Sequence, residues 1–408
     1  MTKLSDIKKE FERYIIVRDD GILPMIFATL VGNMYLHSDP IWLMIIAPSS
    51  GGKSTFIAPI VAVPTCHFLD DLTEKTFLSG YKVKGQEVSL LKQIGSGVLC
   101  FSDFTSILSK NPMSRGEILG QLRLVYDGTF SKRTGTGEIK WQGKIGTIAA
   151  STPDIYTVME SARSMGERFV YYTLEQPTDS EIVAKQQEVK KSSREISQEL
   201  QPLYVSYMAD LKRFIDLKGL PALSIDPEKM DVINEAAIFC VTAKSTVHLD
   251  FKTNKPDALV NKPGVGRDRK MFQTILHALQ VMECYEQDDP NIGVSDAMVR
   301  LVQECAWSSV GRERRKILEI LSSRDTSMTA SEIGATDDFG LPKDSVEKYL
   351  HVLHAVGLVQ KDTKGNTFRW FIASEKTKAF VMDMSGAQKT EFIRSPDEIA
   401  ADDEYERL

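Results

Sequence analysis

Four short apolar runs, each followed by small or polar residues, mark the first half of the chain. They span residues 41–46, 97–101, 145–150 and 169–174. Continuous apolar runs of this length are typical of strands buried on both faces of a parallel sheet. Helical stretches separate the runs, and this alternation predicts an α/β sandwich.

Helical periodicity and one hairpin account for most of the remaining residues up to position 310. Apolar positions at helical spacing predict helices within 1–40 and over 54–61, 181–217, 271–285 and 295–309, while 251–268 is predicted to be a loop. Residues 129–144 contain a Lys-Arg-Thr-Gly-Thr-Gly stretch between strand-like flanks. This pattern predicts a β-hairpin with a basic tip.

Residues 311–373 follow a pattern of their own. Helices are predicted over 314–322, from 329 onward and over 344–355, with strands at 358–360 and 368–372. Thr329 and Glu332 form a capping box at the start of the second helix. Three helices followed by a two-stranded wing indicate a winged-helix domain. Residues 374–408 are polar with an acidic end, and we expect a disordered tail there.

The composition changes this picture little. Hydrophobic residues make up 42% of the 408 positions and charged residues 26%, as in an ordinary globular protein. The net charge of −6 excludes nucleic-acid binding through overall basicity, so any such site must be a local basic feature. The most apolar run, 41–46, is too short to cross a bilayer, so we expect no membrane partner.

The five cysteines lie far apart, without a CxxC pair or a histidine at zinc-ligand spacing. Buried free thiols in a reducing compartment are the natural interpretation. Together with the lack of a leader-like N-terminal segment, this predicts a cytoplasmic protein.

The first apolar run leads directly into a loop of small residues with the chemistry of a phosphate-binding loop. The loop consists of Ala47, Pro48, Ser49, Ser50, Gly51, Gly52, Lys53, Ser54 and Thr55. Backbone N–H groups of such a loop wrap a β-phosphate, and the two glycines permit conformations and approaches that side chains would block. Lys53 would reach the β- and γ-phosphates, and the Ser54 hydroxyl would bind Mg²⁺. A chance Ser/Gly turn is the alternative, but the strand before and the helix after are the context that the motif requires.

Three further residues lie next to predicted strands and have side chains suited to ATP hydrolysis. Asp103 follows the run 97–101 and is the candidate acid near Mg²⁺ and the attacking water, although it would also suit a helix cap. Thr152 follows the run 145–150 and would bond the γ-phosphate or the water, although Ser-Thr-Pro is commonly only a turn. Arg168 precedes the run 169–174 and is either a trans-acting arginine finger or part of an interdomain salt bridge.

In this order, the motifs resemble the AAA+ ATPase core of minichromosome maintenance (MCM) replicative helicases, and in particular the shorter MCM-like helicases of phages and bacterial mobile elements. The resemblance covers residues 40–310, and the winged helix extends it to 373. Residues 149–153 resemble the sensor-1 run, with Thr152 where the family usually has Asn. Residues 167–169 resemble the Ser-Arg-Phe arginine-finger motif, which implies that role for Arg168.

Other residues take implied roles with some departures from the family. Residues 102–104 fall on the family's Asp-Glu-Phe, so that a serine replaces the first carboxylate and Asp103 is the shortened second one. Lys132 and Arg133 fall in the region of the presensor-1 hairpin, which grips DNA inside the ring. Arg267 is the candidate sensor-2 arginine, with Arg269 competing for that role. The oligonucleotide-binding N-terminal domain of full MCM proteins has no counterpart, since residues 1–40 are too few.

The resemblance implies an α/β fold, namely an AAA+ P-loop three-layer sandwich with helical additions and a C-terminal winged-helix domain. The expected parts are an N-terminal helical segment on the core (1–40), the ATPase core (41–178), a helical lid and linker (179–310), the winged helix (311–373) and the tail (374–408). Such a protein would use ATP and Mg²⁺ and form a homo-oligomeric ring, expected to be a hexamer. It would act as a DNA helicase or translocase on single-stranded DNA in the central pore.

Two other functions stay open at this stage. One is an AAA+ loader or remodelling ATPase that acts on a protein partner. The other is a nucleotide-gated regulator that binds duplex DNA without unwinding it. The winged helix leaves the same choice, because such domains contact either duplex DNA or another protein.

Overall fold

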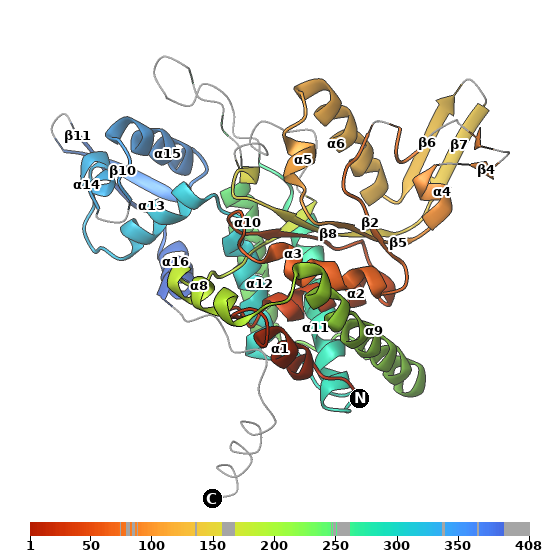
Figure 1. The fold of residues 1–408 in the computed structure, drawn as a ribbon. Helices are drawn as coiled ribbons and strands as arrows, with labels where there is room; N and C mark the ends of the chain where they lie inside the picture. The colour runs from red at the N-terminus through yellow and green to blue at the C-terminus, as the bar shows by residue number, and fades with distance from the viewer. Residues whose placement is uncertain are drawn as a thin grey trace, which may run out of the picture. The chain divides into compact units, whose positions relative to one another are not determined.

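The computed structural model describes residues 1–73, 75–78, 82–83, 86–87, 89–134, 137–156, 168–245, 247, 250, 262–336, 339–364 and 367–386. The chain divides into two compact units. One contains Met1–Lys229 and Lys270–Leu301, and the other contains Met230–Arg269 and Val302–Gln388. Figure 1 shows their helices and strands along the chain.

A five-stranded parallel sheet forms the centre of the first unit. Its order is β2-β5-β8-β1-β9, with β1 at Trp42–Ile46, β2 at Cys66–Phe68, β5 at Gly97–Phe101, β8 at Ile145–Ser151 and β9 at Phe169–Thr173. Every pairing in it is parallel. All four predicted strands are therefore confirmed, and the α/β class with them. The short edge strand β2 was not predicted, because three half-buried residues carry too weak an apolar signal.

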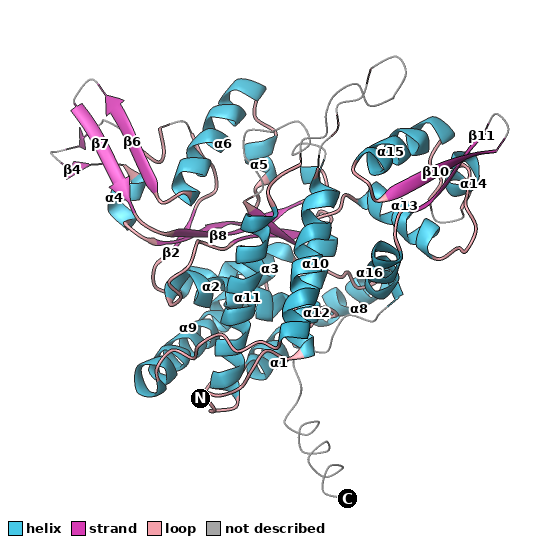
Figure 2. Cartoon of the chain, turned by 180° about the vertical axis from the view of Figure 1, so that it is seen from behind, coloured by secondary structure: helices cyan, strands magenta, loops and turns pink. Residues whose placement is uncertain are grey.

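Helices cover both faces of this sheet (Figures 1 and 2). Alternate residues of β1, namely Trp42, Met44 and Ile46, join one apolar cluster with α4 (Leu90–Ile94), α5 (Thr105–Leu108) and α6 (Pro112–Tyr126). On the other face lies α2 (Ile22–Met34), whose Asn33 side chain bonds both the N–H and the C=O of Ile41 at 2.9 Å. Since successive strand residues point to opposite faces, the fully apolar β1 serves both layers.

Proline and N-terminal capping residues set the ends and starts of the helices around the loop. The helix α3 (Lys53–Ile57) continues only as a 3₁₀-helix, Ala58–Ala62, because Pro59 cannot extend the α-helical bonding. The predicted helix 181–217 was wrong as a single element. It is divided into α8 (Asp179–Glu188) and α9 (Ser193–Lys218), and each begins with its own capping box.

Residues 179–310, predicted to be a helical lid and linker, contribute helices to both compact units. Helix α9 packs in the first unit, where Tyr204 and Tyr207 place their rings 4.7 and 4.6 Å from Phe27. Most of α10 (Pro227–Lys244) belongs to the second unit, and α11 (Val265–Glu286) and α12 (Asp296–Ser308) contribute to both. Helical periodicity identifies apolar faces but does not say which core each face joins.

A long hairpin follows α6, as predicted. Strands β6 (Thr129–Thr134) and β7 (Gly137–Gln142) pair antiparallel, so that Lys132 and Arg133 of the predicted basic tip lie on β6, while residues 135–136 lie outside the described part of the chain. A second, smaller pair is formed by β3 (Lys82–Val83) and β4 (Gln86–Glu87).

The second unit contains the predicted arrangement of three helices and a two-stranded hairpin. The helices are α13 (Arg312–Ser322), α14 (Ala330–Gly334) and α15 (Lys343–Ala355), and the hairpin pairs β10 (Val359–Lys364) with β11 (Thr367–Ile372). The capping box of Thr329 and Glu332 is present. Trp370 is fully buried at the centre of this unit's apolar cluster.

The predicted disordered tail was wrong for its first third. Residues Glu375–Gly386 form a helix, α16, because Val381 and Met384 lie three residues apart and bury into the second unit's cluster. Phe380 adds a ring contact, with its centroid 4.4 Å from that of Phe239. Residues 387–408 lie outside the described part of the chain.

All five cysteines carry free thiols, as predicted, and only Cys66 is partly exposed. None of the helices among the described residues is both long and apolar enough to span a bilayer.

The N-terminal helix α1 (Leu4–Glu12) docks on the end of α11 through a carboxylate, Glu286, with an altered pKa. Its Oε1 accepts the Leu4 N–H at 2.9 Å. Burial raises the Glu286 pKa to about 7 from an ordinary 4.5, against the opposing effects of that bond and Lys3. Below pH 4.5 the group is neutral in both states and affects stability little, whereas above pH 7 the folded protein bears the full cost of the buried charge.

We therefore expect Glu286→Gln to stabilise the protein at pH 8, by up to about 3 kcal/mol, and to have little effect on that account at pH 4. Melting temperatures at both pH values measure this effect. The exposed Glu12→Gln on α1 is the control. An equal shift at both pH values would contradict the assignment.

Candidate functional site

The loop from Ala47 to Thr55 leaves β1 at the carboxyl edge of the sheet, and its two glycines have different roles. Gly52 has φ of 76°, a left-handed conformation that favours glycine. Gly51 instead allows a close approach, because a Cβ there would lie 2.6 Å from Oε1 of Gln176 and 3.0 Å from the Pro48 carbonyl. Ser50 also takes a positive φ, of 63°, which the sequence did not reveal.

Lys53 lies inside the concave face of this loop. Its Nζ donates to the carbonyls of Ala47 at 2.7 Å and Pro48 at 2.6 Å. Burial lowers the Lys53 pKa, and the nearby carboxylate of Asp103 partly offsets that effect. An ammonium group held only by carbonyl dipoles on one side is well placed to bind an anion entering the loop.

The residues predicted after β5 and β8 meet the loop at the same edge, because the carboxyl ends of parallel strands lie together. The Ser54 hydroxyl donates to the Ser102 carbonyl at 3.4 Å. Strand β8 lies between β1 and β5, so Thr152 emerges between the loop and Asp103. The Phe104 N–H donates to the Ala150 carbonyl at 2.7 Å and fixes the turn that carries Asp103 to the end of β8.

Phe104 is the N-cap residue of α5 and makes no side-chain cap bond, so Asp103 fills the alternative capping role only in part. The Asp103 Oδ1 accepts the Thr105 N–H at 2.8 Å at the start of α5. Thr152 donates its hydroxyl proton to Asp154 at 3.1 Å. Among the described residues no three His, Cys, Asp or Glu side chains gather as they would around a metal ion. One carboxylate and one hydroxyl nevertheless suit Mg²⁺, which commonly takes its other ligands from phosphate and water.

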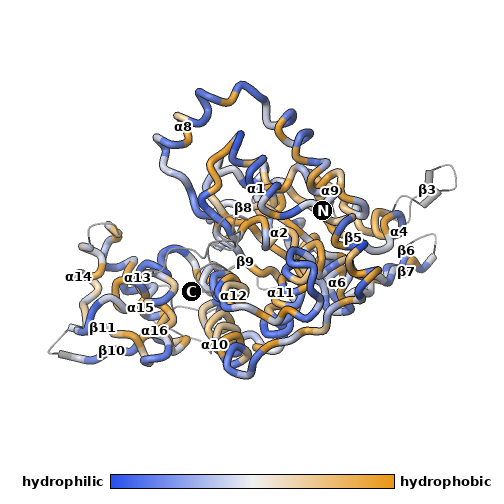
Figure 3. The backbone as a smooth tube through the Cα atoms, turned by 90° about the horizontal axis from the view of Figure 1, so that it is seen from below, coloured by the Kyte–Doolittle hydropathy of each residue, from blue (hydrophilic) through white to orange (hydrophobic). Residues whose placement is uncertain are grey.

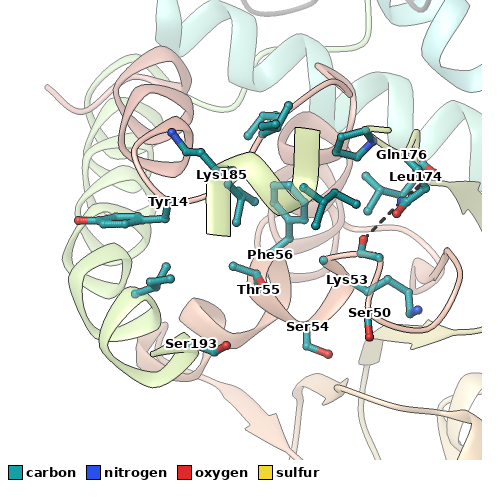
Figure 4. A pocket seen from close by; sticks show the side chains of 18 of the residues that line it. Tyr14, Ser50, Lys53, Ser54, Thr55, Phe56, Leu174, Gln176, Lys185 and Ser193 are labelled. Carbon is teal, nitrogen blue, oxygen red and sulfur yellow. Dashed lines mark hydrogen bonds between the residues drawn. The ribbon is translucent and has the colours of Figure 1, made fainter. Parts of the chain in front are cut away.

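A cavity of about 500 Å³ opens from the loop, within the range of roughly 300–1,000 Å³ typical of small-molecule sites. Figure 4 shows Ser50 and Lys53 at one end of it and Tyr14 and Lys185 at the other. The remaining walls come from residues 14–19, 174–177, α8 and the start of α9. Figure 3 shows α8 mostly in the hydrophilic colour, and this helix has no buried residue.

Asp19 holds one wall of the cavity in place from a buried position. Its carboxylate accepts the Tyr172 hydroxyl proton at 2.5 Å and the Glu175 N–H at 2.9 Å, which ties the segment 14–19 to the end of β9. Arg18 pairs with Glu181 in the first turn of α8. The Thr178 hydroxyl, the Thr178 N–H and Arg18 together hold the Glu181 pKa down to about 2. These contacts join residues 18 and 19 to residues 172–181, more than 150 positions later in the chain.

Sequence reasoning missed this half of the site. Residues 1–40 were predicted only as helices, with no site residue among 14–19, and no motif was found at Gln176. Its amide donates to the Gly51 carbonyl at 3.4 Å, a contact that no local pattern encodes. The S/T-x-x-E capping boxes at 178–181 and 192–195 were the one available signal, because they mark the starts of α8 and α9, the two helices that border the cavity.

Arg168 lies at the opposite edge of the sheet. Its neighbour Phe169 is level with Trp42 at the start of β1, so the length of the strand, about 16 Å, separates Arg168 from the loop of its own chain. The guanidinium is buried and donates from one nitrogen to both carboxylate oxygens of Asp127, at 3.0 and 3.1 Å. It also lies 5.2 Å from the Tyr126 ring centre. A salt bridge therefore exists, but within the first unit rather than between domains.

The remaining candidates are spread over other elements. Lys132, half-buried, and Arg133, exposed, lie on β6 opposite Ile139 and Glu138. Arg267 and Arg269 are exposed at the start of α11, in the part of that helix that belongs to the second unit. The Arg269 Nε donates to Asn234 of α10 at 2.6 Å.

The fold and the site together define an α/β protein with a phosphate-loop geometry at the carboxyl edge of a parallel sheet. Comparison with protein-family models and with curated proteins found no match.

Proposed function

We propose that this chain is an ATPase of the AAA+ class that works as an oligomeric ring, expected to be a hexamer, on single-stranded DNA. The observation that carries the proposal is the convergence of Lys53, Ser54, Asp103 and Thr152 on one edge of the sheet, where Lys53 and Ser54 also line the cavity. That edge is where nucleotides bind in parallel α/β folds.

The cavity has the two-sided chemistry of a nucleotide. At one end the loop supplies backbone N–H groups and Lys53 for phosphates. At the other, apolar side chains and Tyr14 offer a surface suited to a base, and the lining there includes Ile15, Val17, Ile182, Val189 and Ile196. Ser54 and Asp103 would hold Mg²⁺, whose charge would neutralise the phosphates.

The position of Arg168 supports an assembly. Because it lies a full strand length from its own loop, it would serve as a finger only toward the nucleotide of a neighbouring subunit. In such a ring, ATP would lie between subunits.

The hairpin β6–β7 supports a role on DNA. It extends away from the sheet (Figure 1), and Lys132, Arg133 and Lys140 give it an excess of positive charge over Glu138. Contacts of this kind would bind the DNA phosphates without regard to sequence and would weaken as salt rises. The three-helix and hairpin part of the second unit would be a winged helix that contacts duplex DNA or a protein.

ATP hydrolysis with and without single-stranded DNA tests this function, beside a Lys53→Ala control. We expect several-fold stimulation by DNA that falls as salt rises and disappears in Lys132→Ala/Arg133→Ala. Hydrolysis that ignores DNA would leave the ATPase proposal standing and favour a loader or a regulator instead.

A further inference from the structure

The Arg168–Asp127 ion pair joins the candidate finger directly to the base of the hairpin. Asp127 is the residue after α6, and Gly128 and the first residue of β6 follow it at once. Only one residue therefore separates the carboxylate that holds Arg168 from the strand that carries Lys132. All of these residues belong to the first unit.

The base of the hairpin has the construction of a hinge. Gly128 has φ of 77°, and a Cβ there would lie 2.9 Å from the Gly143 carbonyl. The Gly143 N–H donates to the Gly128 carbonyl at 3.0 Å, so two glycines close the hairpin where it leaves the core. Asp127 therefore directly precedes the point where the two ends of the hairpin are bonded together.

The carboxylate of Asp127 depends on Arg168 for its place. Asp127 caps the C-terminal end of α6, where the helix dipole disfavours negative charge. It is nearly half exposed, whereas the Arg168 side chain is almost fully buried. The Tyr126 ring covers the guanidinium, and removing that cation would leave a carboxylate at an unfavourable helix end.

We propose that Asp127 is a positioning residue that couples nucleotide state to the hairpin by exchange of anions on Arg168. Without a neighbour's nucleotide, the guanidinium binds Asp127, as it does in the structure, and this ion pair holds the base of the hairpin. When a neighbouring subunit presents a γ-phosphate, Arg168 transfers to it, Asp127 is released and the base loosens at Gly128 and Gly143. This coupling rests on the proposed function, because it needs a neighbour's nucleotide.

Hydrogen exchange in the full-length protein tests the coupling, with and without a non-hydrolysable ATP analogue, at a concentration where sedimentation shows assembly. In the wild type the analogue should slow exchange in the loop peptide, residues 47–57, and speed it in peptides spanning 125–134 and 137–143. Asp127→Asn should show exchange about fivefold faster or more at the hairpin base without nucleotide, and no further change with it. Glu138→Gln, which removes an exposed carboxylate from the same hairpin, should behave like the wild type.

Arg168→Lys is the second variant, since it keeps a buried cation but loses the planar guanidinium that lies against the Tyr126 ring. It should also loosen the hairpin base in a folded protein. A wild-type pattern in both variants would overturn the coupling. Loop protection without any hairpin response in the wild type would overturn it too, while leaving nucleotide binding intact. Absence of loop protection would instead refute the proposed function, and the coupling with it.

Discussion

Lys53→Ala is expected to lower ATP hydrolysis by at least about 100-fold, because it removes the one cation placed inside the loop. The Lys53 ammonium is held by the carbonyls of Ala47 and Pro48, so it is already positioned before any phosphate arrives. Such a group needs little rearrangement when negative charge develops in the transition state. A cation positioned in advance stabilises that state most strongly.

Phosphate release, followed at saturating ATP, measures this loss. Lys110→Ala is the matched control, since Lys110 pairs with Asp71 at 2.9 Å and does not line the cavity. A fluorescent ATP analogue separates weaker binding from slower chemistry. Turnover of Lys53→Ala within a few-fold of the wild type would show that the loop is not part of the site of hydrolysis.

Arg168→Ala is expected to bind ATP normally and to hydrolyse it about 1,000-fold more slowly, the range seen for arginine fingers supplied by a neighbour. The physical reason is the strand length that separates Arg168 from its own loop. The substitution in one subunit should therefore slow hydrolysis at the nucleotide site of the neighbouring subunit.

Mixing two inactive variants makes this expectation specific. A Lys53→Ala subunit keeps its Arg168, and an Arg168→Ala subunit keeps its loop. In a mixed ring about one interface in four should combine an intact loop with an intact finger, so activity should return. Continued inactivity of the mixture, with each variant folded and assembled, would contradict a shared site. Full activity of Arg168→Ala alone would assign Arg168 a purely structural role as the partner of Asp127.

The strands and the loop were predictable because their signals are local. The run 41–46 is apolar at every position, and only a strand covered on both faces accommodates that at such a length. The two glycines of the loop were predicted for unusual conformations and close approaches, and the structure shows Gly52 needed for its backbone angle and Gly51 for a close approach.

Elements whose fate depends on distant partners were not predictable in the same way. The residues of α16 are polar on average, and only the cluster of the second unit supplies a surface for Val381 and Met384. The helices within 179–310 showed apolar faces, but their division between two units follows from which surfaces those faces complement. The break between α8 and α9 at 189–192 was the exception, since the capping box that follows it consists of residues only three positions apart.

The sequence by itself determined the class of the fold and the loop of small residues after β1, because both depend on residue types within a few positions of one another. The tertiary structure decided which residues share the site. It placed Thr152 between the loop and Asp103, since β8 lies between β1 and β5. It added residues 14–19 as a wall through the buried carboxylate of Asp19, and it set Arg168 at the far edge against Asp127. Strand order and long-range hydrogen bonds produce these contacts, and neither leaves a periodic pattern in the chain.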